Sequence, residues 1–108
     1  MTSPRAARLV RMLVILSKSA QTRPALMRQL KLDLRGYYRD LVLVRDSGVA
    51  VVFADGRYHL RDKLEDAIAK LPCPDPGLTL GEATLVAKGR TPAHKKFQDE
   101  LALVLPRD

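Results

Sequence analysis

Cysteine, tryptophan and aromatic residues in general are scarce in this chain. Its 108 residues include one cysteine and no tryptophan, and aromatic residues make up 5%. A single cysteine, Cys73, excludes an internal disulfide, and the prolines on either side of it indicate a linker. We therefore expect a protein of a reducing compartment, the cytoplasm, without disulfide bonds.

Long apolar runs are also missing. Three arginines precede an apolar run at residues 12–16, which superficially resembles a signal peptide, but the run ends at Ser17 and Lys18. A helix that spans a bilayer needs about 20 apolar residues. We expect a soluble protein that is not exported and has no membrane partner. Its length suits one domain, or a small domain with a helical appendage.

Patterns that carry enzyme chemistry are absent from the sequence. It has no glycine-rich phosphate loop, no nucleophile elbow and no pair of carboxylates at catalytic spacing. Neither His59 nor His94 has a partner at metal-ligand spacing. Asp40 is a conceivable catalytic acid, but a polar residue that braces a helix or its arginines is the better interpretation. We expect no enzymatic activity, no cofactor, no metal and no small-molecule ligand.

Positive charge is in excess, and it is concentrated in the first 62 residues. The formal net charge is +7 at pH 7. Twelve Lys and Arg oppose five acids through Asp62, whereas seven basic and seven acidic residues cancel from Lys63 onward. A polyanion is attracted to such a segment by counterion release and long-range steering. A basic surface that only aids solubility is the alternative.

Apolar periodicity predicts three helices and a hairpin in the same 62 residues. The helices are expected at residues 5–19, between Thr22 and Leu30, and at 34–47, with Thr22 and Asp33 as N-caps and Gly48 as the end of the third. Residues 49–53 and 57–60 predict two strands around an Asp55-Gly56 turn. This order predicts an α+β, mainly α, winged helix-turn-helix fold.

A C-terminal helical extension is predicted for residues 63–108. A short apolar stripe at residues 64–71 is followed by a proline-rich linker at 72–77, and Thr79 with Glu82 forms a capping box for a helix ending near Gly89. The domain boundary is expected at residue 62.

The last predicted helix begins at Thr91 and places Phe97, Leu101 and Val104 on one side. We expect this stripe to join two copies of the chain into a homodimer, so that residues 63–108 act as a dimerisation module. Folding back on the N-terminal domain is the alternative arrangement.

The helix at 34–47 is predicted to have one packing face and one exposed cationic face. At 100° per residue, Leu34, Tyr37, Leu41 and Val44 share the packing side, and Arg35, Tyr38, Arg39 and Val42 share the other. Two arginines one turn apart can bind guanine edges or phosphates when a helix enters the major groove, and the Tyr38 hydroxyl suits a phosphate. An ordinary solvated helix face is the alternative.

Further basic residues surround this recognition helix in the predicted fold. Arg57 follows the Asp55-Gly56 turn, so it is expected at the tip of a wing formed by residues 49–60, on the flanking backbone or minor groove. A residue that only decorates the turn is the alternative. Arg23 and Arg28 on the second helix, with Thr22 at its start and Arg5 on the first, are candidates for DNA backbone contacts.

The segment at residues 5–60 resembles the DeoR-like winged helix domain of the WYL-domain bacterial transcriptional regulators. In this resemblance Leu30-Lys31-Leu32 stands for the family's turn, Asp33 for its serine cap, Arg35 for its second arginine, Tyr37-Tyr38-Arg39-Asp40-Leu41 for its core motif, Gly48 for its helix end and residues 55–60 for its wing. The chain departs from the family at Leu34, where the family has arginine, and at Gly36, where it has threonine. A DNA backbone could approach Gly36 closely.

The resemblance implies a prokaryotic, sequence-specific double-stranded DNA-binding regulator that lacks the WYL domain. Residues 78–105 are more loosely similar to the helical connector of those regulators, and such connectors often pair two subunits. The base preference is not implied, because Leu34 and Gly36 differ from the family.

Two other functions stay open at this point. A winged helix can serve as a protein-interaction adaptor with only non-specific nucleic-acid affinity, and Val42 and Leu43 would add apolar surface for a partner. RNA binding has only the basic charge in its favour, because the sequence shows no evident stacking platform of aromatic residues.

Overall fold

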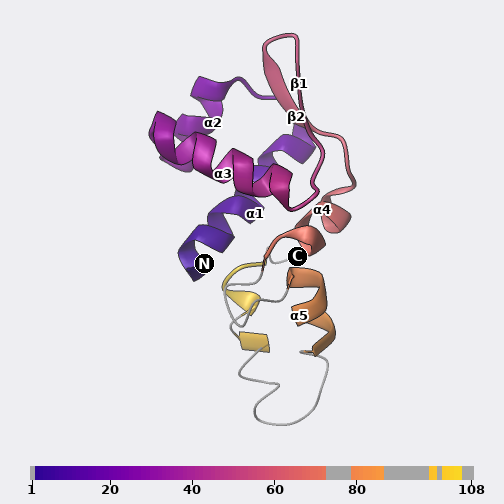
Figure 1. Cartoon of the computed structure of the whole chain (residues 1–108). Helices are drawn as coiled ribbons and strands as arrows, with labels where there is room; N and C mark the ends of the chain where they lie inside the picture. The colour runs from indigo at the N-terminus through magenta and orange to yellow at the C-terminus, as the bar shows by residue number, and fades with distance from the viewer. Residues whose placement is uncertain (1, 73–78, 87–97, 100, 106–108) are drawn as a thin grey trace.

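The computed structural model describes residues 2–72, 79–86, 98–99 and 101–105. Within these ranges the chain is α+β and mainly helical, with one antiparallel hairpin (Figure 1). In chain order the elements are α1 (Ser3–Lys18), α2 (Arg23–Leu30), α3 (Leu34–Asp46), β1 (Val51–Ala54), β2 (Arg57–Leu60), α4 (Leu64–Lys70) and α5 (Leu80–Val86). The predicted order of three helices and a hairpin is confirmed, and it is compatible with a winged helix.

Side-chain caps begin α2 and α3 where the sequence predicts them. The Thr22 hydroxyl accepts the N–H of Ala25, and the Asp33 carboxylate accepts the N–H of Gly36 at 2.7 Å. Each bond satisfies a backbone donor that the first turn of a helix leaves unpaired. Between the two helices, Lys31 adopts a left-handed φ of 55°, which ends α2 two residues before Asp33, the N-cap of α3.

The hairpin follows from the chemistry of its turn. Asp55 and Gly56 have φ values of 55° and 77°, as a two-residue turn of type I′ requires. The strands pair in the register Val51↔Leu60, Val52↔His59, Phe53↔Tyr58 and Ala54↔Arg57. The first strand begins two residues later than expected, because the N–H of Val49 still bonds to the α3 carbonyl of Val44.

The link between α1 and α2 lies beside β2. Gln21 and Tyr58 exchange two backbone hydrogen bonds, with N···O distances of 2.9 and 2.7 Å. This bridge fixes the hairpin relative to the start of α2. The sequence pattern did not predict it.

α1 supplies the centre of the hydrophobic core, and α3 packs one face against it. The described core residues are Ala6, Leu9, Val10, Met12, Leu13, Leu16, Leu26, Leu30, Tyr37, Leu41, Val44, Val49, Val51, Tyr58, Ala67, Ile68, Leu71, Leu80, Leu101 and Val104. The expected packing face of α3 is confirmed at Tyr37, Leu41 and Val44. It is wrong at Leu34, which is 49% exposed at the first position of the helix, while Leu32 packs against the core instead.

The described part of residues 63–108 packs on the same core. α4 buries Ala67 and Ile68, and the predicted capping box forms at the start of α5, where the N–H of Glu82 bonds to the Thr79 hydroxyl at 3.1 Å. The core is therefore continuous across residue 62. Figure 1 shows α5 at the opposite end of the molecule from the tip of the hairpin.

Two of the three residues named for dimerisation, Leu101 and Val104, are buried within one chain. Leu101 and Val104 are 6% and 5% exposed, which is the arrangement in which the C-terminal segment folds back on its own domain. Neither side chain is thus an exposed surface for a second copy. Phe97 lies outside the described residues, and homodimerisation stays a prediction. No helix among the described residues is long and apolar enough to cross a bilayer.

Candidate nucleic-acid interface

α3 turns two arginines outward. Arg35 and Arg39 are exposed one turn apart, Tyr38 is 40% exposed between them, and Val42 continues the same face at 55%. The predicted exposed face of this helix is confirmed. Within the part of the chain that the structure describes, neither guanidinium forms a hydrogen bond or an ion pair. Both groups are free to bind a ligand without breaking an existing contact.

The residue that follows Arg39 is buried and holds α3 on α1. The Asp40 carboxylate is fully buried and accepts hydrogen bonds from Arg8 Nε at 2.6 Å, Arg8 Nη2 at 3.2 Å and Arg5 Nε at 3.2 Å. The bonds to Asp40 raise the pKa of Arg8. Asp40 therefore braces arginines, as the sequence suggested, but they belong to α1. Arg5, which the sequence offers as a candidate DNA backbone contact, belongs to this cluster through its Nε.

The start of α2 is joined to the exposed face of α3. Arg23 Nη1 donates a hydrogen bond to the Tyr38 hydroxyl at 2.9 Å, and this bond raises the pKa of Arg23. Thr22 is half-buried and caps the helix. Arg28 is exposed on the same helix. Arg23 and Tyr38, both predicted DNA contacts, are therefore brought together by the structure, whereas Arg28 is not part of this hydrogen bond.

The hairpin places one arginine at its tip. Arg57 is exposed directly after Gly56, in the position that the sequence predicts. At its base, Arg45 donates to the Val51 carbonyl at 3.1 Å and lies 5.9 Å from the centre of the Tyr58 ring. Arg45 therefore fixes the hairpin on α3.

Gly36 has a structural role at the start of α3. Its N–H is engaged in the Asp33 cap, and a Cβ atom built at Gly36 would lie 3.0 Å from the capping carboxylate oxygen. The cap explains a small residue here independently of any approach of DNA.

Four aromatic side chains form a cluster that includes Tyr38 on the exposed face of α3 and extends to the hairpin. Ring centres lie 5.4 Å apart for Tyr37 and Tyr38, 5.8 Å for Tyr37 and Tyr58, and 4.7 Å for Phe53 and Tyr58. Phe53 is 56% exposed. Tyr37 and Tyr58 are buried and the rings are tilted against one another, so the cluster is not an exposed stacking platform for bases. The Asp55-Gly56 turn pairs residue 53 with residue 58, which brings Phe53 and Tyr58 together.

A cavity of about 400 Å³ lies where α2, α3 and the hairpin meet. Its lining residues come from all three: Thr22, Arg23, Pro24, Tyr38, Phe53, Gly56 and Tyr58. The cavity therefore adjoins the exposed face of α3 through Tyr38.

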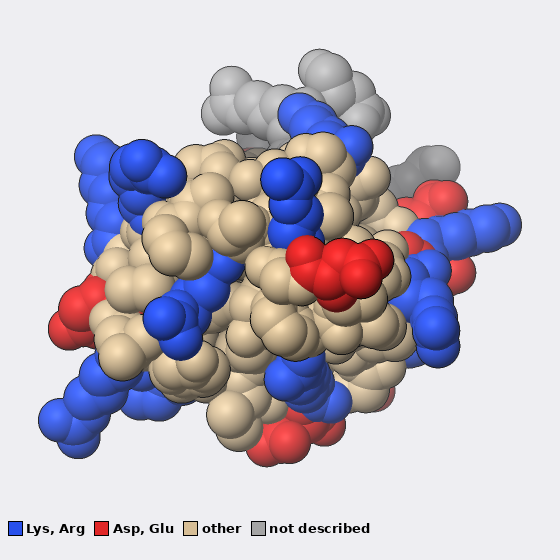
Figure 2. Space-filling model, turned by 90° about the horizontal axis from the view of Figure 1, so that it is seen from above, with Lys and Arg blue, Asp and Glu red and all other residues tan. Residues whose placement is uncertain are grey.

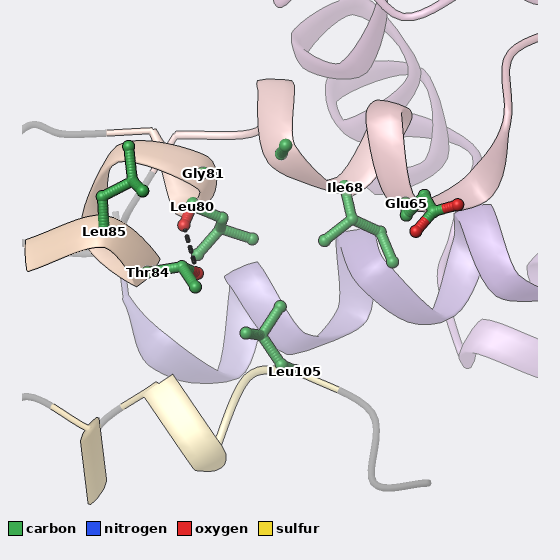
Figure 3. Close-up of a pocket in the computed structure, with 8 residues that line it drawn as sticks. Glu65, Ile68, Leu80, Gly81, Thr84, Leu85 and Leu105 are labelled. Carbon is green, nitrogen blue, oxygen red and sulfur yellow. Dashed lines mark hydrogen bonds between the residues drawn. The ribbon is translucent and has the colours of Figure 1, made fainter. Parts of the chain in front are cut away.

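A second cavity, of about 370 Å³, lies between α4, α5 and Leu105 (Figure 3). Its lining is mainly apolar, and the Thr84 hydroxyl at its wall already donates to the Leu80 carbonyl at 2.8 Å. Gly81 allows α5 to approach α4, since a Cβ there would lie 3.0 Å from the Ala69 Cβ. None of the exposed arginines named above lines this cavity.

Positive charge surrounds the end of the molecule that carries α2 and the hairpin. Viewed from that end, Lys and Arg side chains project on several sides and acidic side chains occupy fewer places (Figure 2). This distribution of positive charge suits an extended anionic ligand.

Among the described residues, no group of three or more His, Cys, Asp or Glu side chains is placed to hold a metal ion.

Comparisons with protein-family models, with curated proteins and with solved structures give no match. The resemblance to the DeoR-like domain therefore stays an expectation from the sequence.

Proposed function

We propose that this protein is a sequence-specific double-stranded DNA-binding transcriptional regulator with a winged helix-turn-helix fold. α3 is the recognition helix and lies in the major groove, and the β1–β2 hairpin is the wing on the flanking backbone or minor groove. The observation that carries the proposal is the outward position of Arg35 and Arg39, which have no partner among the described residues, on a helix whose opposite face is buried.

The two arginines supply base recognition in this proposal. Arg pairs with the O6 and N7 acceptors of guanine through two parallel hydrogen bonds, and each such pair is worth about 1–3 kcal/mol of discrimination against a wrong base. Leu34, which is exposed beside Arg35, adds an apolar contact of the kind that reads a thymine methyl group. The buried Asp40 prevents rotation of α3 on the core, which keeps these side chains in register.

The wing adds a second contact with the duplex. Arg57 projects at the tip of the hairpin, where the negative potential of a narrow minor groove favours arginine. The Gln21–Tyr58 bridge and the Arg45 bonds hold the hairpin at a fixed angle to α3. Recognition helix and wing therefore meet DNA as one rigid unit.

The first experiment selects bound duplexes from a random pool with the purified full chain, followed by mobility shift over a range of salt. We expect Arg39→Ala to weaken binding to the selected site about 5- to 150-fold and to relax the preference at one base pair. Lys63→Ala, which removes an exposed cation at the start of α4, is the matched control. Unchanged affinity and unchanged base preference in Arg39→Ala would refute the assignment of α3.

A homodimer remains part of the proposal, because two recognition helices on a palindromic site gain affinity and specificity. Since Leu101 and Val104 are buried, the exposed apolar residues Leu85 and Leu103 are the better candidates for the contact. A palindromic consensus from the same selection supports the dimer. If Leu103 lies in the contact, the wild type should sediment as a dimer and Leu103→Asp as a monomer.

A protein-interaction adaptor is the second candidate, and the exposure of Val42 and Leu34 favours it. It predicts a defined partner that co-purifies after nuclease treatment and is lost in Val42→Asp but retained in Arg39→Ala. The DNA-binding function predicts that any co-purifying protein is held through DNA and is lost after nuclease treatment.

A further inference from the structure

The cavity between α2, α3 and the hairpin has a cationic wall and an aromatic wall. Arg23 and the Tyr38 hydroxyl form the first, and the rings of Phe53 and Tyr58 form the second. No acidic residue is among the residues that line it. A ligand of this cavity is therefore an acceptor of hydrogen bonds that carries negative charge beside an apolar group.

The hydrogen bond within the cationic wall leaves its donors available. Arg23 Nη1 donates to the Tyr38 oxygen at 2.9 Å, so the Tyr38 hydroxyl proton is not needed for this bond and can be donated elsewhere. A guanidinium has five N–H donors, and this bond uses one of them. The bond also holds the Arg23 side chain over the cavity, which reduces the entropy lost when a ligand binds.

We infer that this cavity seats one phosphate of the DNA backbone, bound at the same time by the Arg23 guanidinium and the Tyr38 hydroxyl, with the adjoining sugar against the Phe53 ring. The inference rests on the proposed DNA-binding function and deepens it. Tyr38 lies on the same face of α3 as Arg35 and Arg39, so a duplex that receives this face passes its backbone over the cavity. A volume of about 400 Å³ leaves room for a sugar beside the phosphate.

The consequence is a fixed register between protein and duplex. Phosphate contacts position a protein on DNA without reading the bases. The lining residues of this contact come from α2, α3 and the hairpin together. A single phosphate therefore sets the position of the recognition helix and of the wing on the duplex.

The test replaces each phosphate of the selected duplex, one at a time, by an uncharged methylphosphonate and measures binding of the full chain. We expect one position at which the replacement weakens wild-type binding about 10-fold but weakens Tyr38→Phe and Arg23→Ala much less. Because both residues serve one phosphate, the double variant binds little worse than either single variant. The salt slope falls by about one in Arg23→Ala, which loses a cation, and stays at the wild-type value in Tyr38→Phe, which loses only a neutral hydroxyl.

Two controls separate failure of this inference from failure of the proposed function. Lys63→Ala removes an exposed cation outside the cavity and should respond to the methylphosphonate position as the wild type does. The shared phosphate contact is refuted if Tyr38→Phe binds like the wild type, or if the affinity losses of Tyr38→Phe and Arg23→Ala multiply in the double variant. DNA recognition stands in either case if Arg39→Ala still relaxes the base preference. If the wild-type chain binds no duplex, both proposals fail.

Discussion

Arg8 Nε lies 2.6 Å from Asp40 Oδ2, and this contact joins the central helix of the core to the helix that carries the exposed arginines. Asp40 is fully buried, although its neighbour in the chain, Arg39, is exposed. Burying a carboxylate is tolerated only when charge and hydrogen bonds compensate its lost hydration, and here two arginines supply both. The pair therefore sets how α3 is rotated on the core, and with it which residues face outward.

Replacing the buried carboxylate by an amide should lower stability. Asp40→Asn removes the charge that both arginines bind, and we expect it to lower the free energy of unfolding by about 1.5–3 kcal/mol. Urea denaturation measures the change, and Asp46→Asn, at an exposed position at the end of α3, is the control. Arg8→Gln should cost more than Arg5→Gln, because Arg8 makes two bonds to Asp40 and Arg5 makes one. Equal stability of the two Asp→Asn variants would contradict this account.

Removing a hydroxyl from the core should be harmless or favourable. The Tyr37 hydroxyl is the buried side-chain group without a hydrogen-bond partner of good geometry among the described residues. Burial, and after it the neighbouring Tyr58 hydroxyl, raises the pKa of Tyr37. A buried, unpaired hydroxyl costs about 1–3 kcal/mol of desolvation. We expect Tyr37→Phe to unfold at an equal or higher urea concentration than the wild type. A clear loss of stability would mean that the hydroxyl has a partner in solution.

The helices, their caps and the hairpin were predictable because their signals are local. Thr22 and Asp33 stand directly before the helices that they cap, and the Asp55-Gly56 pair specifies both the turn and the register of the strands. The exposed positions of Arg35 and Arg39 follow from the helical period. These features depend on residues only a few positions apart, so their spacing in one sequence is enough to predict them.

The contacts that complete the candidate site could not be predicted, because they join distant segments. Asp40 meets Arg8 across 32 residues and Arg23 meets Tyr38 across 15. Leu34 has the period of the buried face, yet it lies at the helix start, where Leu32 packs against the core instead. Periodicity identifies a face and leaves open which segment covers it.

A side chain at residue 36 should stabilise the protein only when the Asp33 cap has been removed. Ala stabilises a helix by about 1 kcal/mol relative to Gly. In this chain a Cβ at Gly36 would lie 3.0 Å from the Asp33 oxygen, so the cap has to shift and its contribution of about 1 kcal/mol is weakened. We expect Gly36→Ala to leave thermal stability nearly unchanged in the wild type and to raise it in an Asp33→Ala background. Equal gains in both backgrounds would show that the cap does not restrict this position.

Asp62 should make the hairpin region sensitive to acid. Its carboxylate accepts the N–H of Ala50 at 3.0 Å and lies 3.5 Å from Lys70 Nζ. These contacts, the backbone bond first, lower the pKa of Asp62 below the ordinary aspartate value. Because the pKa is lower in the folded state than in the unfolded state, the stabilisation is complete above the ordinary aspartate pKa and is lost as the pH falls through the folded value.

Wild type and Asp62→Asn should therefore differ in stability at pH 7 and converge as the pH falls below about 4, where the wild-type carboxyl becomes protonated and resembles the amide. Thermal midpoints measured from pH 7 to pH 2 report this convergence. Lys70→Met should keep most of the pH dependence, since the backbone bond is the larger cause of the shift. Asp46→Asn, whose carboxylate is exposed, provides the reference for acid effects elsewhere in the chain. A gap between wild type and Asp62→Asn that stays constant to pH 2 would show that the charge of Asp62 does not stabilise the fold.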